Sequence, residues 1–191
     1  MAKEHAFIAE ELAGFIRRQP VFFVATAAAE GRVNLSPKGL DGSFCILGPR
    51  QVAFLNLTGS GNETAAHLRV NPLITLMFCG FDGEASILRL YGAGRAVHPR
   101  DSAWPELDAH FPDYAGKRQI VTVEVSHVVT SCGFGVPRMD LVSQRPTLPD
   151  WAGGKGEAGI RDYWRDKNQV SFDGLPTGIL EEGSTGILEE T

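Results

Sequence analysis

The 191-residue sequence has no excess of basic residues, because 18 Lys and Arg stand against 23 Asp and Glu and the formal net charge is −5. A protein that binds nucleic acid by neutralising its phosphates needs such an excess, so this class of protein is not expected. The chain also has only three cysteines, Cys45, Cys79 and Cys132, which lie far apart and form no Cys-x-x-Cys pair. Their spacing argues against a disulfide framework and against a zinc knuckle.

Long apolar runs are missing as well. No stretch approaches the ~18 apolar residues of a membrane span, and the N-terminal sequence MAKEHAFIAEEL has no apolar run of signal-peptide length. We therefore expect a reduced, cytoplasmic protein with no membrane partner. The sequence also lacks a Gly-x-Ser-x-Gly motif and a His-x-x-x-His pair, so neither serine hydrolysis nor a metal site is expected.

The sequence does contain a succession of short strand patterns separated by turn residues. Six segments fit a β-strand: 21–26, 33–36, 51–57, 73–78, 85–97 and 119–129. Helices are expected over 6–19, about 62–70, 101–111 and 151–167. So many strands joined mainly as hairpins hide their edges most economically by closing into a small barrel.

The length predicts one domain with a terminal extension. We expect the barrel to occupy 1–131 and an extended, Gly- and Pro-rich arm with its helix, 132–175, to pack on the barrel or on a partner. The hexapeptide TGILEE occurs twice, at 177–182 and 185–190. Two copies are too few for a solenoid, so 176–191 is expected to be a flexible acidic tail.

The strongest functional signal lies where a strand runs through a small-residue loop, 58–61, into a helix. Ser60 and Glu63 match a capping box. The first turn of such a helix presents unpaired N–H groups and the positive end of the helix dipole, and the loop glycines let a ligand approach closely. The helix start is therefore a candidate phosphate site. A well-capped helix after a strand explains the same residues, and the Glu63 carboxylate competes with an anion.

A second element is the strand end Ser36-Pro37-Lys38-Gly39. Its hydroxyl and its cation can be aimed at one spot, against a phosphate or an electron-rich ring edge. The alternative for Lys38 is a solvated surface charge.

Three segments, FFVATAAAEGRVNLSPKG, VAFLNLTGSGNETAAHLRVNPLITLMF and SILRLYGAGRAV, follow one another over residues 20–98. In this order they resemble the pyridoxamine 5′-phosphate oxidase-like proteins, and the sequence after Cys132 is similar to the tail of an uncharacterised branch of that family. The resemblance implies a mainly β fold with α-helices: a six-stranded antiparallel split β-barrel with flanking helices and an extended C-terminal arm. It also implies a homodimer that holds two FMN molecules at the subunit interface.

The resemblance assigns candidate cofactor-binding residues. Ser36 and Lys38 are candidates beside the flavin, and Arg89 is a candidate from the same or the partner subunit. The candidates beside the ribityl chain and the phosphate are Asn56, Thr58, Asn62 and Thr64. His67, one helical turn after Thr64, is a further candidate, with a packed helix residue as the alternative.

The chain departs from the authentic oxidase at two points. That enzyme has a basic pair at the start of this helix, where Glu63 and Thr64 stand here, and it has a C-terminal Arg-x-His, which this sequence lacks. Pyridoxamine phosphate is therefore not the expected substrate. We expect an FMN-dependent oxidoreductase acting on a small-molecule redox substrate, with no catalytic side chain identified. A non-catalytic flavin- or haem-binding module and a deazaflavin-dependent reductase remain alternatives.

Overall fold

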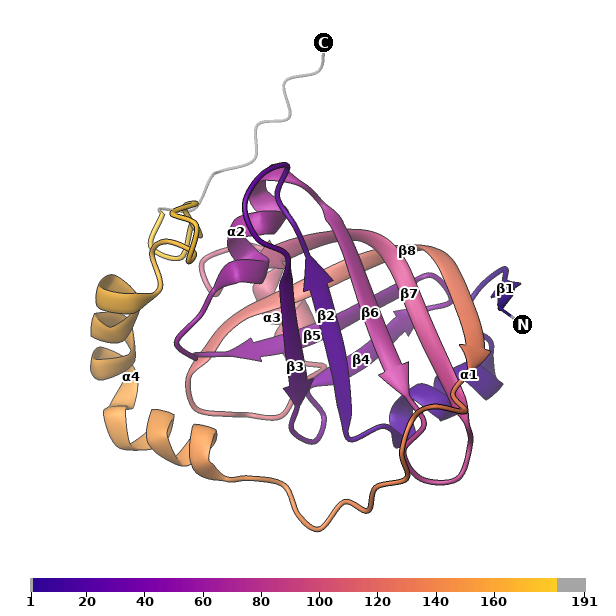
Figure 1. Cartoon of the computed structure of the whole chain (residues 1–191). Helices are drawn as coiled ribbons and strands as arrows, with labels where there is room; N and C mark the ends of the chain where they lie inside the picture. Colours follow the sequence, from indigo (N-terminus) through magenta and orange to yellow (C-terminus); the bar gives the residue numbers. More distant parts are fainter. Residues whose placement is uncertain (1, 182–191) are drawn as a thin grey trace.

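The computed structural model describes residues 2–181 and shows one antiparallel sheet that curls into a barrel (Figure 1). Its strands are β1 (Lys3–His5), β2 (Val21–Thr26), β3 (Asn34–Gly39), β4 (Phe44–Gly48), β5 (Gln51–Leu57), β6 (Leu73–Cys79), β7 (Ser86–Val97) and β8 (Lys117–Cys132). The order is β3-β2-β6-β7-β8-β5-β4, and β1 pairs with β8. The two edge strands, β3 and β4, leave the barrel split between them.

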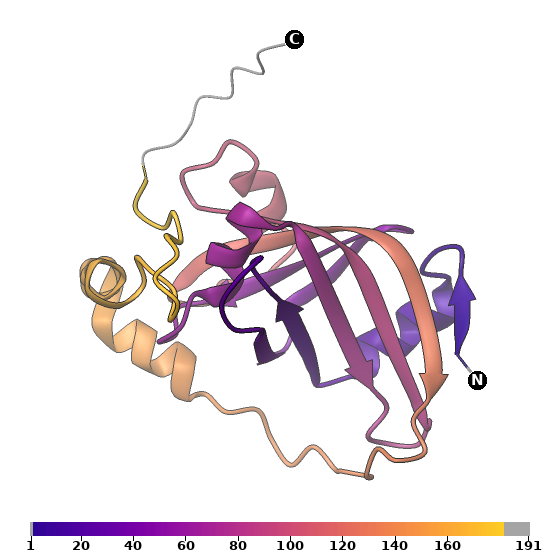
Figure 2. The same ribbon diagram turned by 45° about the horizontal axis from the view of Figure 1, so that its top comes forward.

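The barrel interior is built from the alternate side chains that each strand turns inward. Phe22, Phe54 and Phe78 form its aromatic centre, with the Phe22 and Phe78 rings stacked at a centroid distance of 5.5 Å. Helix α1 (Glu10–Arg18) packs against one end of this core through Phe15 and Ile16 (Figure 2). A second, smaller core lies on the outer face of β5 and β8, where Leu55 and Ile120 pack with residues of helix α3 (Trp104–Asp108).

The C-terminal part of the chain runs from the end of β8 through an exposed arm to helix α4 (Thr147–Lys167), which is kinked at Gly156 (Figure 1). The chain then returns towards helix α2 (Glu63–Val70). Thr177 and Ile179, which belong to the predicted tail, are buried, and the Arg100 guanidinium donates to the carbonyl groups of Gly178 and Ile179. The rest of that tail, 182–191, with the second hexapeptide copy, lies outside the described residues.

The predicted fold class is confirmed, but the sheet has eight strands where six were predicted, since β1 and β4 were missed. Two helix details were also wrong. Helix α1 begins at Glu10, after β1, and the helix predicted over 101–111 has only five residues, Trp104–Asp108, while the Asp101 carboxylate accepts from the His98 N–H at 2.8 Å in the turn before it. The division at residue 131 stays a prediction.

Helix α2 does not use the predicted capping box. Its N-cap is Asn62, not Ser60, and no side chain caps the helix. The Glu63 carboxylate accepts instead from the backbone N–H of Phe172, 109 residues away, at 2.9 Å.

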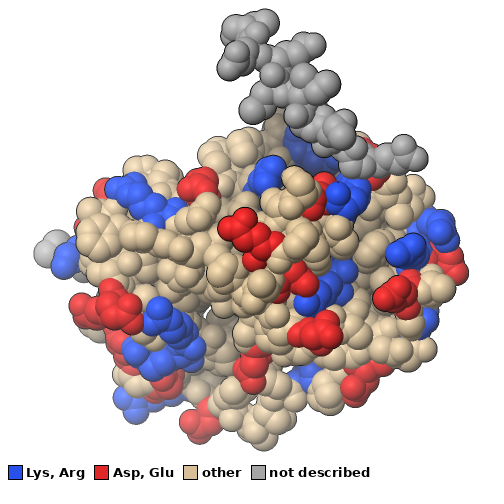
Figure 3. Space-filling model, turned by 180° about the vertical axis from the view of Figure 1, so that it is seen from behind, with Lys and Arg blue, Asp and Glu red and all other residues tan. Residues whose placement is uncertain are grey.

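On the face turned away from the view of Figure 1, acidic and basic side chains are interspersed (Figure 3). Among residues 2–181, no helix combines the length and the apolar character that crossing a membrane requires.

Candidate functional site

The inner face of the barrel turns from apolar to polar close to the split. On β5, Val52 and Phe54 belong to the core, and Asn56 is the next inward position. On β8, Val121 belongs to the same core and Gln119 precedes it on the same face. Strand β3 is polar along its whole inner face, because Asn34, Ser36 and Lys38 pair with Thr26, Val24 and Phe22 of β2. The alternation of strand residues thus gathers polar groups in one place.

Lys38 bridges the split. Its Nζ donates to Asn56 Oδ1 at 2.8 Å, which joins β3 to β5. Burial is the main reason that the pKa of Lys38 falls from 10.5 to about 8, and the nearby Arg118 guanidinium lowers it further. The ammonium is therefore held in its charged form at neutral pH at a cost, and the sequence-based alternative of a solvated surface lysine is wrong.

Asn34 is the centre of a hydrogen-bond network between β2, β3 and α2. Its Nδ2 donates to Thr26 Oγ1 and to Thr64 Oγ1, both at 3.1 Å, and its Oδ1 accepts from Ser36 Oγ at 2.8 Å. Thr26 Oγ1 also shares a hydrogen bond with His67 Nδ1 at 3.1 Å, and His67 is only 2 % exposed. Three of the predicted residues, Ser36, Thr64 and His67, are thus brought together.

Arg118 is the most deeply buried cation of this region, at 2 % exposure, and burial lowers its pKa to about 10. Its Nη1 donates to the carbonyl of Gly59 at 3.2 Å and to Asn168 Oδ1 at 3.0 Å. Beside it, Gln119 Nε2 donates to Asn62 Oδ1 at 2.7 Å. Within residues 2–181, neither Arg118 nor Lys38 has a carboxylate within ion-pair distance.

Three buried polar atoms here have no hydrogen-bond partner in the described part of the chain: Asn62 Nδ2, Arg118 Nε and Gln119 Oε1. Buried polar atoms are nearly always satisfied, and buried charges are nearly always paired. Two unpaired cations and unsatisfied amide groups therefore suit an anionic, hydrogen-bonding ligand. We call the set Asn34, Ser36, Lys38, Asn56, Asn62, Thr64, His67, Arg118 and Gln119 the polar cluster.

Two predicted residues lie apart from the polar cluster. The Thr58 hydroxyl is fully buried, donates to the carbonyl of Gly116 at 2.8 Å and accepts from Trp164 Nε1 at 2.9 Å, so it holds the loop in place. Arg89 lies between the core residues Leu88 and Leu90 and so faces the outside of the sheet, where it donates to Ser131 Oγ at 3.1 Å. A single chain therefore does not bring Arg89 to the cluster, and its role stays a prediction.

Three members of the polar cluster were missed from the sequence. Asn34 carried a usable signal, because it shares the inner face of its strand with Ser36 and Lys38. Gln119 begins the predicted strand 119–129 and shares a face with Val121, so it also carried a signal, whereas Arg118 precedes that predicted strand and carried none.

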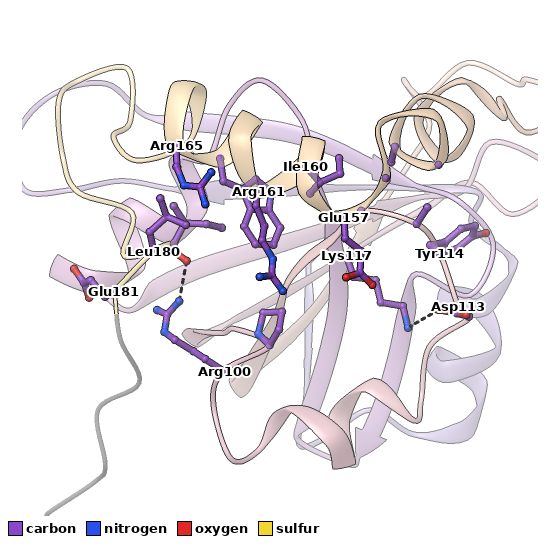
Figure 4. A pocket seen from close by; sticks show the side chains of 18 residues that line it. Arg100, Asp113, Tyr114, Lys117, Glu157, Ile160, Arg161, Arg165, Leu180 and Glu181 are labelled. Carbon is purple, nitrogen blue, oxygen red and sulfur yellow. Dashed lines mark hydrogen bonds and ion pairs between the residues drawn. The ribbon is translucent and has the colours of Figure 1, made fainter.

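A separate cavity of about 880 Å³ lies between α4, the loop before β8 and residues 179–181 (Figure 4). Arg161 and Arg165 extend from α4 along it (Figure 4). None of the eight predicted cofactor-binding residues lines this cavity. Trp164 separates the two regions, since it lines the cavity and its indole N–H reaches Thr58.

A family model, a relative of known sequence and several solved structures are similar to this chain. A family model described as pyridoxamine 5′-phosphate oxidase matches residues 8–132. The pyridoxamine 5′-phosphate oxidase family protein ustO of Aspergillus flavus is 37% identical over 188 residues, which cover 88% of this chain and 75% of that protein. Two crystal structures of HupZ from Group A Streptococcus share the fold, with a TM-score of 0.51 at 16% and 17% identity. They cover 65% and 63% of this chain and 99% and 91% of their own.

Proposed function

The chain belongs to the pyridoxamine 5′-phosphate oxidase family, and we propose that it is an FMN-dependent oxidoreductase that works as a homodimer on a small-molecule redox substrate. The observation that carries the proposal is the pair of cations formed by the half-buried Lys38, whose Nζ is desolvated, and the buried Arg118, neither of which has a carboxylate within ion-pair distance among the described residues. FMN, when bound, supplies the hydride or electron transfer, and the protein binds and orients it.

The phosphate of FMN fits the end of the polar cluster next to the loop 59–62 and the start of α2. Asn62 Nδ2 is a donor without a partner, and helix N–H groups favour an anion at this position. The Glu63 carboxylate, which competes with an anion, is engaged by the Phe172 N–H. Ser36 and Lys38 then serve the ring side, where a cation stabilises negative charge on the flavin.

Exposed apolar side chains on the outer face of the sheet favour the proposed homodimer. Leu35, Ala25, Thr75 and Tyr91 form one line of cross-strand neighbours over β3, β2, β6 and β7. Leu35 is 65% exposed and Tyr91 37%. Exposed apolar residues that lie together mark an interaction surface. A partner on this face buries them and brings groups such as Arg89 to a cleft that one small barrel leaves shallow.

The test compares FMN with riboflavin, which lacks the phosphate. FMN-free protein is titrated with each flavin and followed by fluorescence quenching. We expect Asn62→Ala and Thr64→Val each to weaken FMN binding about tenfold, the loss of one charge-assisted hydrogen bond, and to leave riboflavin affinity nearly unchanged. Thr122→Val, on the opposite face of β8, is the matched control.

Equal affinities of the unmodified protein for FMN and riboflavin would refute the phosphate site. An absorption spectrum with a Soret band and no flavin bands would favour the haem-binding alternative. A single species of ~21 kDa in sedimentation at micromolar concentration, near the 20.7 kDa chain mass, would rule out the homodimer.

A further inference from the structure

We infer that residues 164–173, at the end of α4 and beyond it, complete the flavin site, with Asn168 as the positioning residue. The inference rests on the proposed function. The segment lies outside residues 8–132, the part that matches the family model. Its contacts nevertheless fall on the loop before α2, on Arg118 of β8 and on Arg32, which precedes β3.

Asn168 is the central contact of the segment. Its side chain is completely buried, and its Nδ2 donates to the carbonyl groups of Gly59 and Ser60 at 3.0 and 3.3 Å. Its Oδ1 accepts from Arg118 at 3.0 Å. One amide thus fixes the backbone of the loop and the direction of the buried guanidinium. Among uncharged side chains, only the amides of Asn and Gln carry two N–H donors and a carbonyl acceptor on one group.

The backbone of Asn168 is held as firmly as its side chain. Its N–H donates to the carbonyl of Trp164 at 3.0 Å and so ends α4, and its carbonyl accepts from the buried Thr177 hydroxyl at 2.5 Å. The amide therefore has little freedom to follow the loop if the loop moves. The loop and Arg118 take their positions from the C-terminal segment.

The two ends of the segment form hydrogen bonds with the loop before α2, with the start of α2 and with the residue Arg32 ahead of β3. At one end, the Trp164 indole N–H donates to Thr58 at 2.9 Å. At the other end, the Phe172 N–H holds the Glu63 carboxylate at 2.9 Å. The Asp173 carboxylate then accepts from the Arg32 backbone N–H at 2.7 Å and pairs with its guanidinium, just before β3 begins.

The arm that leads to α4 adds little to this docking. Phe134 and Val142 are 85% and 95% exposed, so the arm packs on almost nothing in its own chain. The segment is therefore held by α4, whose Ala152 and Ile160 are buried, by the contacts at the flavin site and by the burial of Thr177 and Ile179. Because coupling between two binding events is reciprocal, FMN and the docked segment stabilise each other.

The experiment compares three variants with the unmodified chain. Asn168→Ala removes all three side-chain contacts. Asn168→Asp keeps an acceptor for Arg118, but the new carboxylate forms an ion pair with the guanidinium and so competes with an anionic ligand. It also places a carboxylate oxygen against the two carbonyl groups to which the amide donated. Asp173→Asn weakens the grip on the exposed Arg32 and is not expected to impair folding. Gln169→Ala is the matched control within the segment, because the Gln169 side chain is exposed and its one hydrogen bond within the described residues is to the carbonyl of Arg165, while its backbone contacts with Thr177 are kept.

We expect FMN affinity to fall at least tenfold in both Asn168 variants and several-fold in Asp173→Asn, with riboflavin affinity nearly unchanged and Gln169→Ala unaffected. Trypsin cleavage after Arg165 and Lys167 should slow when FMN is added to the unmodified protein, and much less in Asn168→Ala. Far-UV circular dichroism and thermal unfolding identify a variant that fails to fold, in which case Asp173→Asn decides.

If the unmodified protein binds FMN and the folded variants bind it equally well, the inference is wrong. An equal loss of FMN and riboflavin affinity in the Asn168 variants would show a merely structural role and overturn it too. If the unmodified protein binds no flavin, the proposed function itself fails, and this inference fails with it.

Discussion

Lys38→Met is expected to stabilise the FMN-free protein and to weaken FMN binding. The charged ammonium is buried, and burial with Arg118 nearby lowers its pKa from 10.5 to about 8. Such a drop corresponds to about 3 kcal/mol against the charged form at neutral pH. Methionine has a similar length and no charge, so it removes this cost. Losing the hydrogen bond leaves the buried Asn56 Oδ1 without this donor and takes back about 1–3 kcal/mol.

The expected net gain is therefore at most about 2 kcal/mol, or up to roughly 4–8 °C in melting temperature for a domain of this size. FMN affinity should fall at least tenfold, because one of the two buried cations is lost. Urea unfolding of FMN-free protein at pH 7 measures the stability, and flavin titration measures the affinity. Lys3→Met, which removes an exposed lysine from β1 where it pairs with Thr130 at the far end of β8, is the control for both.

The pH dependence of the free energy of unfolding tests whether charged Lys38 destabilises the FMN-free protein. Between about pH 8 and 10.5, folded Lys38 has lost its proton while the unfolded lysine keeps it, so the unfolded state binds more protons and stability rises with pH. Below about pH 8 both states are protonated, and the full cost is present. Lys38→Met should lack this rise. A variant that is less stable than the unmodified protein and binds FMN as tightly would refute the reasoning, and would show Lys38 to be a structural bridge across the split.

Three further predictions concern the cofactor, the C-terminus and the dimer. FMN affinity should fall as pH rises through about 8, where Lys38 loses its charge, and flavin titrations at pH 7, 8 and 9 should show no such fall in Lys38→Met. A chain ended after Gly178 should lose about 2–4 kcal/mol in urea unfolding relative to one ended after Glu181, because it lacks Ile179, which is only 4% exposed. Leu35→Glu should yield monomers in sedimentation and lower the FMN affinity, whereas dimers with normal affinity would place the interface elsewhere.

The sequence predicted those parts of the fold that have strong local patterns. Strand β8 alternates over most of its length and β5 contains the apolar run 52–55, and both strands were found. Strand β4 was missed because Phe44–Gly48 are all half-buried, so that no alternation appears. Strand β1 has three residues and exists through its pairing with β8, which no local pattern reports.

The site was only partly predictable, because several of its residues depend on contacts between distant segments. Ser36 and Lys38 were found from the end of their strand, and Asn62 and Thr64 from a glycine-rich helix start. The contacts of Arg118, by contrast, come from a loop 59 residues and a segment 50 residues away. The capping box failed for the same reason, since a C-terminal N–H takes the Glu63 carboxylate that a local rule gives to the helix.

The cost of the polar cluster and its proposed use have the same physical origin. Buried cations without a carboxylate lower the stability of the protein alone, and an anion that reaches them recovers that free energy as binding energy. A carboxylate placed beside Lys38 or Arg118 would stabilise the fold and would compete with FMN. The one carboxylate at the loop, Glu63, is instead held by the C-terminal segment. The same segment therefore positions Arg118 and keeps a competing charge engaged, which couples its docking to the affinity for FMN.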